Sequence, residues 1–134
     1  GRDLTGTILK GADLSGKNLT GTILVGADLS DAKLTGVDLS GVNLSNAILT
    51  DANLENATLE GAKLLDADLD SVNLTNANLR NTILVDANLS NATLIGADLS
   101  GAILTGAILT GADLENAVLT NAILNCVGHP ICIK

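Results

Sequence analysis

Few side chains in this sequence could carry chemistry, and a compact group of them lies near its end. Cys126, His129 and Cys132 are spaced as C-x2-H-x2-C around a Gly and a Pro. The two cysteines could form a disulfide, stay reduced as small hydrophobic side chains, or join the histidine as zinc ligands. We favour the disulfide, with reduced thiols as the alternative. Zinc would need a fourth ligand, and Pro130 adjoins the histidine.

A second set of polar side chains recurs along the whole chain. Thirteen Asp or Asn residues each stand directly before a Leu. Calcium-binding solenoids use a longer motif, G-G-x-G-x-D, which is absent here. Short polar side chains beside a turn bond readily to nearby backbone groups, so we expect a structural role for this set.

The inventory for catalysis is otherwise small. His129 is the single histidine of the chain, and no partner is evident that would orient it against a cysteine nucleophile. We therefore predict a protein that is not an enzyme, with no catalytic residue, no metal, no cofactor and no small-molecule substrate.

The composition indicates a folded protein and argues against several other classes. The chain has 134 residues, of which 46% are hydrophobic, 16% charged and none aromatic. That is enough apolar material for a core and argues against a disordered chain. The formal net charge of −8 and the lack of a basic patch argue against nucleic-acid binding. No apolar stretch approaches the ~18 residues that span a bilayer.

The elements that position these side chains follow from a repeat of five residues. Leu occupies every fifth position from Leu4 to Leu124, and the residue two before it is mostly Ala. On a helix or a straight strand this spacing would scatter the leucines over different faces. The residue two after Leu is Gly, Asn or Asp in 23 of 25 repeats, with Ser71 and Cys126 as the others. Such residues tolerate positive φ, so we expect one turn per repeat.

A longer modulation indicates how many repeats close one coil. Of the seven Ile that precede a Leu, four fall in one class modulo 20 and three in the next, and none in the other two. Four repeats per coil account for this, because residues twenty apart then stack on the same side. The first class is Ile23, Ile83, Ile103 and Ile123, and the second is Ile8, Ile48 and Ile108.

The repeats Ala12-Asp13-Leu14-Ser15-Gly16 and Ala52-Asn53-Leu54-Glu55-Asn56 resemble the pentapeptide-repeat family. The resemblance covers residues 2–126. It implies an all-β fold: a right-handed, four-sided parallel β-solenoid, with the Leu and the small residue two before it facing inward. With four repeats per coil, about six coils are expected.

The decay of the repeat after Asn125 indicates how the chain divides. We expect a solenoid over residues 1–125 and a capping tail over residues 126–134. In the tail, Val127, Ile131 and Ile133 are expected to fold over the last coil. Arg2 and Lys17 interrupt the small inward column and are expected to reach past the edge of the first coil into water.

One side of the predicted coil differs from the others. Of its 14 outward positions seven are apolar and the net charge is zero, whereas the other sides carry −2, −3 and −2. We interpret this side as a candidate partner face, although the β-propensity of branched residues is an alternative explanation. Its apolar residues are Ile23, Val25, Leu65, Ile83, Val85, Ile103 and Ile123.

The predicted function is a rigid, non-catalytic structural or protein-interaction module. Its partner is expected to be another protein, and a homodimer through the apolar side is the simplest form. The family resemblance implies an alternative, a DNA-mimicking inhibitor or protector of type II topoisomerase (gyrase). Duplex DNA carries about 18 charges over ~30 Å, however, and this chain nets −8. A disulfide would favour the periplasm or thylakoid lumen, and reduced cysteines the cytoplasm.

Overall fold

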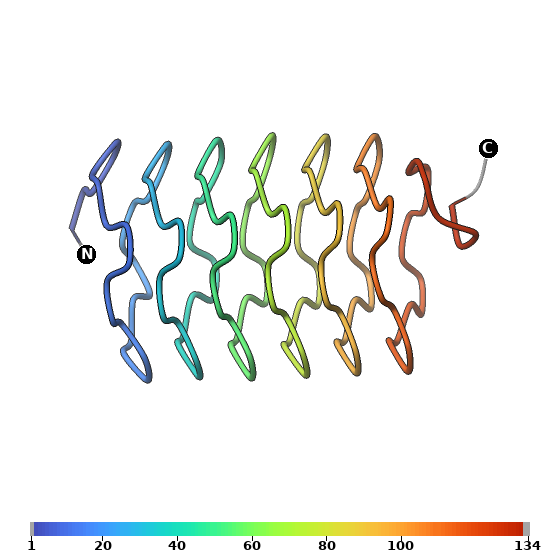
Figure 1. Ribbon diagram of the computed structural model, residues 1–134, viewed down its shortest axis with the longest axis horizontal. Coiled ribbons are helices and arrows are strands. Elements are labelled where there is room, and N and C mark those ends of the chain that lie inside the picture. Colours follow the sequence, from blue (N-terminus) through green and yellow to red (C-terminus); the bar gives the residue numbers. More distant parts are fainter. Residues whose placement is uncertain (1, 133–134) are drawn as a thin grey trace.

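The chain winds into a stack of similar coils along one axis, with its two ends at opposite ends of the stack (Figure 1). The computed structural model describes residues 2–132, and within them it contains no helix and no extended strand. Each repeat instead contributes a single residue to parallel pairing. These bridges link residues twenty apart, from Asp3 with Ile23 to Ile103 with Ile123. The predicted four repeats per coil are confirmed.

The turns lie where the sequence predicts them. Every fifth residue from Gly6 to Asn121 has a positive φ, including Ser71 at 60°. In a representative repeat, the N–H of Ala77 donates to the carbonyl of Leu74 at 3.0 Å and closes a four-residue turn. The third residue of that turn needs the left-handed backbone conformation that Gly, Asn and Asp tolerate best.

Backbone hydrogen bonds use four of the five N–H groups of most interior repeats. In the repeat Val72–Asn76, Val72 donates within its own coil, to the carbonyl of Leu69 at 3.1 Å. Asn73 donates to the preceding coil, at Ala52, over 3.0 Å. Leu74 and Asn76 donate to carbonyls of the following coil, over 2.7 and 2.9 Å. Only the residue directly after the Leu remains.

The Asp and Asn residues before Leu bind this fifth N–H. Asn73 Oδ1 accepts from the N–H of Thr75 at 3.1 Å and from its hydroxyl at 2.6 Å. The bond to the backbone recurs at all thirteen Asp and Asn positions, so the expected structural role is present in the structure. The acceptors are Asp3, Asp13, Asn18, Asp28, Asp38, Asn43, Asn53, Asp68, Asn73, Asn78, Asn88, Asp98 and Asp113.

We expect Asn88→Ala to lower the free energy of unfolding by about 1 kcal/mol, because the N–H and hydroxyl of Ser90 lose their protein acceptor. Thr93→Ala is the matched control, since no side-chain hydrogen bond of Thr93 is present within residues 2–132. Urea denaturation of both variants measures the difference. Equal losses would mean that the side-chain bond contributes nothing.

The interior consists of the Leu column and the small column, as the resemblance implies. From Leu24 to Leu109 every Leu of the column is at most 2% exposed, and the Ala residues between them are equally buried. Thr82 replaces an Ala, and its hydroxyl is satisfied by the carbonyl of Leu79 at 2.8 Å. In the first coil Arg2 and Lys17 are exposed, as expected.

The repeat loses one residue near its end. Ile108 pairs with Val127, nineteen positions away, so the parallel ladder reaches residue 127. Cys126 was expected at a turn, but it lies inward, only 8% exposed, and has no positive φ. The missing residue moves Cys126 into the small inward column and Val127 into the outward column.

This shift corrects the predicted cap. Val127 is 58% exposed and does not cover the last coil, so its expected role is wrong. Ile131 is half-buried and packs against the core, together with Cys132. Ile133, the third expected cap residue, lies outside the described residues.

Candidate interaction face

The candidate face is the side of the solenoid that carries Leu4, Leu24 and the leucines at each further step of twenty. We call it the neutral side. Two columns of side chains flank the inward leucines there. One column is the bridged ladder from Asp3 to Ile123. The other runs from Thr5 to Asn125 and is joined by bonds such as Asp66 N–H to the carbonyl of Val85 at 3.0 Å.

The structure brings five of the seven predicted residues together. Ile83, Ile103 and Ile123 are successive members of the bridged column. Leu65 and Val85 are successive members of the adjacent column, one coil apart. These five residues form a continuous group over the C-terminal half of the neutral side. We call it the apolar patch: Leu65, Ile83, Val85, Ile103 and Ile123.

The other two predicted residues lie apart from the patch. Ile23 and Val25 are both on the second coil, and the next coil places Asn43 and Ser45 between them and the patch. Two coils separate Val25 from Leu65, or about 10 Å at the usual strand spacing. Lys63 stands in the bridged column between Asn43 and Ile83. The seven residues are therefore a group of five and a separate pair.

The exposure of each patch residue depends on its neighbours on the adjacent coils. Ile83, Val85 and Ile103 are half-buried, because branched side chains on adjacent coils cover one another. Ile123 is 47% exposed and Leu65 is 40% exposed, so the patch is most accessible at its margins. An aliphatic surface without charge therefore remains partly open to solvent.

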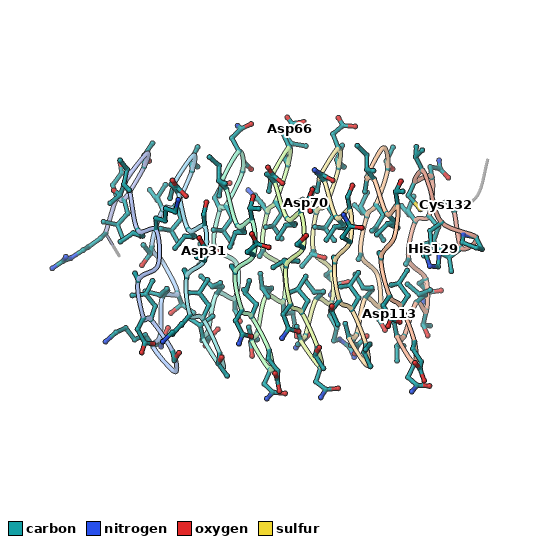
Figure 2. The ribbon with its side chains drawn as sticks, in the orientation of Figure 1. Asp31, Asp66, Asp70, Asp113, His129 and Cys132 are labelled. Atoms are coloured by element: carbon teal, nitrogen blue, oxygen red, sulfur yellow. A yellow bond between two sulfur atoms is a disulfide. The ribbon has the colours of Figure 1, made fainter. Side chains whose placement is uncertain are left out.

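The adjacent side, which carries Leu9, is acidic. Its bridged column alternates Ile8 and Ile48 with Asp28 and Asp68. Asp66 projects from a turn that borders this side (Figure 2). This side and its two bordering turns hold seven Asp and one Lys: Asp28, Asp31, Asp51, Asp66, Asp68, Asp70, Asp86 and Lys10.

Hydrogen bonds from hydroxyl groups lower the pKa of several outward carboxyl groups. The Ser30 hydroxyl, and then its N–H, hold the pKa of Asp28 below its ordinary value of 3.8. Ser100 lowers the pKa of Asp98 in the same way, with a smaller contribution from Arg80. The negative charge of these groups therefore persists to lower pH than that of an ordinary Asp.

The two cysteines are joined at the C-terminal end. The structure contains the predicted Cys126–Cys132 disulfide, with a Cα–Cα distance of 4.9 Å. His129 Nδ1 accepts from the N–H of Ile131 at 3.2 Å. Because the sulfurs are bonded to each other, neither is a zinc ligand or a nucleophile in this form. Among residues 2–132 no three His, Cys, Asp or Glu side chains gather as a metal-binding group.

Together, the fold and this face define a class of protein: a right-handed, four-sided β-solenoid built from five-residue repeats. The sequence profile described as Pentapeptide repeats (8 copies) matches residues 3–36, 14–51, 38–76, 73–111 and 104–127. The chain belongs to the pentapeptide-repeat family. No curated protein sequence matches it.

Solved structures agree with this assignment. Rfr23, a pentapeptide repeat protein from the cyanobacterium Cyanothece 51142, is 35% identical, with a TM-score of 0.68 over 96% of this chain and 92% of its own. A pentapeptide repeat protein from the Arabidopsis thaliana thylakoid lumen is 36% identical, with a TM-score of 0.54 over 81% and 72%.

A more distant likeness concerns the fold alone. A trypsin-treated variant of QnrB1, a plasmid-mediated fluoroquinolone resistance protein, has a TM-score of 0.74 at 22% identity. The match covers 89% of this chain and 66% of that one.

Nothing helical between residues 2 and 132 has the length and apolar character needed to cross a bilayer.

Proposed function

We propose that this protein is a rigid, non-catalytic module that binds another protein through the apolar patch. The observation that supports the proposal is the contrast between sides. The patch offers Leu65, Ile83, Val85, Ile103 and Ile123 on a side with no net charge, next to a side that, with its bordering turns, carries seven of the 15 acidic residues. Contiguous exposed aliphatic surface of this kind is typical of protein contacts.

A second copy of the chain is the partner that the charges allow most simply. Each molecule nets −8, so two copies that meet through an acidic side repel each other. The neutral side avoids this repulsion. A twofold pairing would bury the same patch on both molecules.

We expect the double substitution Ile83→Lys and Val85→Lys to abolish self-association while leaving the solenoid folded, because it places two charges inside the patch. The matched control is Ile48→Lys with Thr50→Lys, which flanks a Leu in the same way on the acidic side. Light scattering after size exclusion gives the mass of each protein. A wild-type protein that stays monomeric, or a patch variant that keeps the dimer mass, would contradict the proposal.

The DNA-mimicking alternative has one observation in its favour, the acidic side. Seven Asp and one Lys on that side and its bordering turns leave a net −6 there, still far below the roughly 18 charges of DNA over the same length. The likeness to QnrB1 concerns the fold only. A gyrase supercoiling assay separates the two functions, since robust inhibition at micromolar protein would favour the alternative.

We propose an oxidising compartment, the periplasm or a thylakoid lumen, as the location. The Cys126–Cys132 disulfide supports this, because such bonds persist where thiols are not kept reduced. The likeness to a thylakoid lumen protein at 36% identity is consistent with it.

A further inference from the structure

The C-terminal tail is attached to the solenoid by the backbone hydrogen bonds of Val127 and, further along, by the disulfide and the packing of Ile131. The ladder continues only as far as Val127, which donates to the carbonyl of Ala107 at 2.9 Å and accepts from Leu109 at 2.8 Å. After Val127 the chain leaves the coil path. Gly128 has a φ of 89° and passes so close to Thr110 that an added Cβ would lie 3.0 Å from its backbone nitrogen.

The tail then turns back towards the core. The N–H of Cys132 donates to the carbonyl of His129 at 3.0 Å and closes a tight turn. Ile131 and Cys132 pack against the hydrophobic core, as do the leucines of the last coil, which are themselves only half-buried. His129 and Cys132 lie together at this end of the stack (Figure 2).

The disulfide joins two different parts of the structure. Cys126 occupies the inward column and belongs to the last coil, whereas Cys132 belongs to the returning tail. Few other contacts hold the returning segment. Beyond Val127, its backbone makes one backbone–backbone hydrogen bond within the described residues, and that bond lies inside the tail. The attachment of the returning segment therefore depends on the disulfide and on the packing of Ile131.

We infer that the Cys126–Cys132 disulfide is a redox latch on the C-terminal end of the solenoid. When it is closed, the tail lies against the last coil. When it is reduced, the tail leaves, and the ladder between the last two coils opens far more often. This inference is independent of the apolar patch and of its partner.

The latch opens by thiol–disulfide exchange with a dithiol reductant. One thiolate of the dithiol attacks Cys132 Sγ, because Cys126 is buried. The sulfur–sulfur bond breaks, Cys126 leaves as a thiolate, and a mixed disulfide forms. The second thiolate of the dithiol then displaces Cys132. Both cysteines end as thiols after protonation, and the dithiol ends as a disulfide.

Hydrogen exchange with and without dithiothreitol tests the latch on the intact chain. The reporters are the N–H groups of Gly106, Leu109 and Val127, whose bonds join the last two coils. The internal controls are Leu84 and Asp86, which make the equivalent bonds one coil further in. Loss of a seven-residue closed loop is expected to raise exchange at the reporters by up to roughly 50-fold, with no change at the controls.

A single variant separates the latch from other effects of the reductant. Cys132→Ser leaves Cys126 in the inward column and removes the bond. It should exchange like the reduced wild type, and dithiothreitol should change it no further. Equal exchange in oxidised and reduced wild type would overturn the inference. A rise of equal size at reporters and controls would also overturn it, since the disulfide would then stabilise the whole chain rather than its end.

Discussion

Leu64→Ala is expected to lower the free energy of unfolding by about 2–5 kcal/mol. Leu64 lies in the middle of the stack and is fully buried. Its side chain belongs to one continuous cluster of buried leucines and small residues, so its removal leaves a cavity inside a packed core. The backbone bonds of Leu64, such as its 2.7 Å donation to Ile83, are unaffected.

Leu14→Ala is the matched control for this prediction. Leu14 holds the same place in its repeat, but it lies in the first coil and is half-buried. Less contact is lost, and water reaches the space that remains. Urea denaturation followed by far-UV circular dichroism compares the two. If both variants lose the same stability, the stacked interior is not what holds the solenoid together.

Much of this architecture could be predicted from the sequence, because each column of the repeat has one physical requirement. The Leu column needs bulk, the small column needs space for the opposing Leu, and the turn column needs positive φ. Ser71 shows that the position itself imposes the conformation. It has a φ of 60° although serine has little intrinsic preference for that region.

The shortened last repeat could not be predicted from the residue types in the columns of the repeat. Cys126 is small enough for either the turn or the inward position, so its identity does not reveal the loss of a residue. The available signal comes after it. Gly128 stands where the shifted register would require a Leu, and this marks the point at which the chain leaves the coil.

The composition of the interaction face was predictable, but its continuity was not. Sorting by twenty assigns Ile23 and Ile83 to the same side, and the bridges confirm that they share one column. This grouping by position does not consider which residues lie on the coils between Ile23 and Ile83. On those coils Asn43 and Lys63 interrupt the aliphatic surface. Contact on a solenoid depends on neighbouring coils, so a face must be judged coil by coil.

Asn76→Val is expected to lower the free energy of unfolding by about 1–2 kcal/mol or more. Asn76 has a φ of 58°, where a branched β-carbon crowds the backbone. Its N–H donates to the carbonyl of Ile95 at 2.9 Å, and a valine would keep this bond. No backbone hydrogen bond is therefore lost, and we expect the cost to arise from the turn conformation.

Asn76→Gly separates this conformational cost from the loss of the amide side chain. Glycine adopts the same φ without crowding, so we expect its stability to stay within about 0.5 kcal/mol of the wild type after its greater chain entropy is included. In thermal and urea denaturation, the wild type and the glycine variant should both be more stable to unfolding than the valine variant. A glycine variant as unstable as the valine variant would assign the effect to the lost amide. The requirement for positive φ would then not explain why Gly, Asn and Asp occupy the turns.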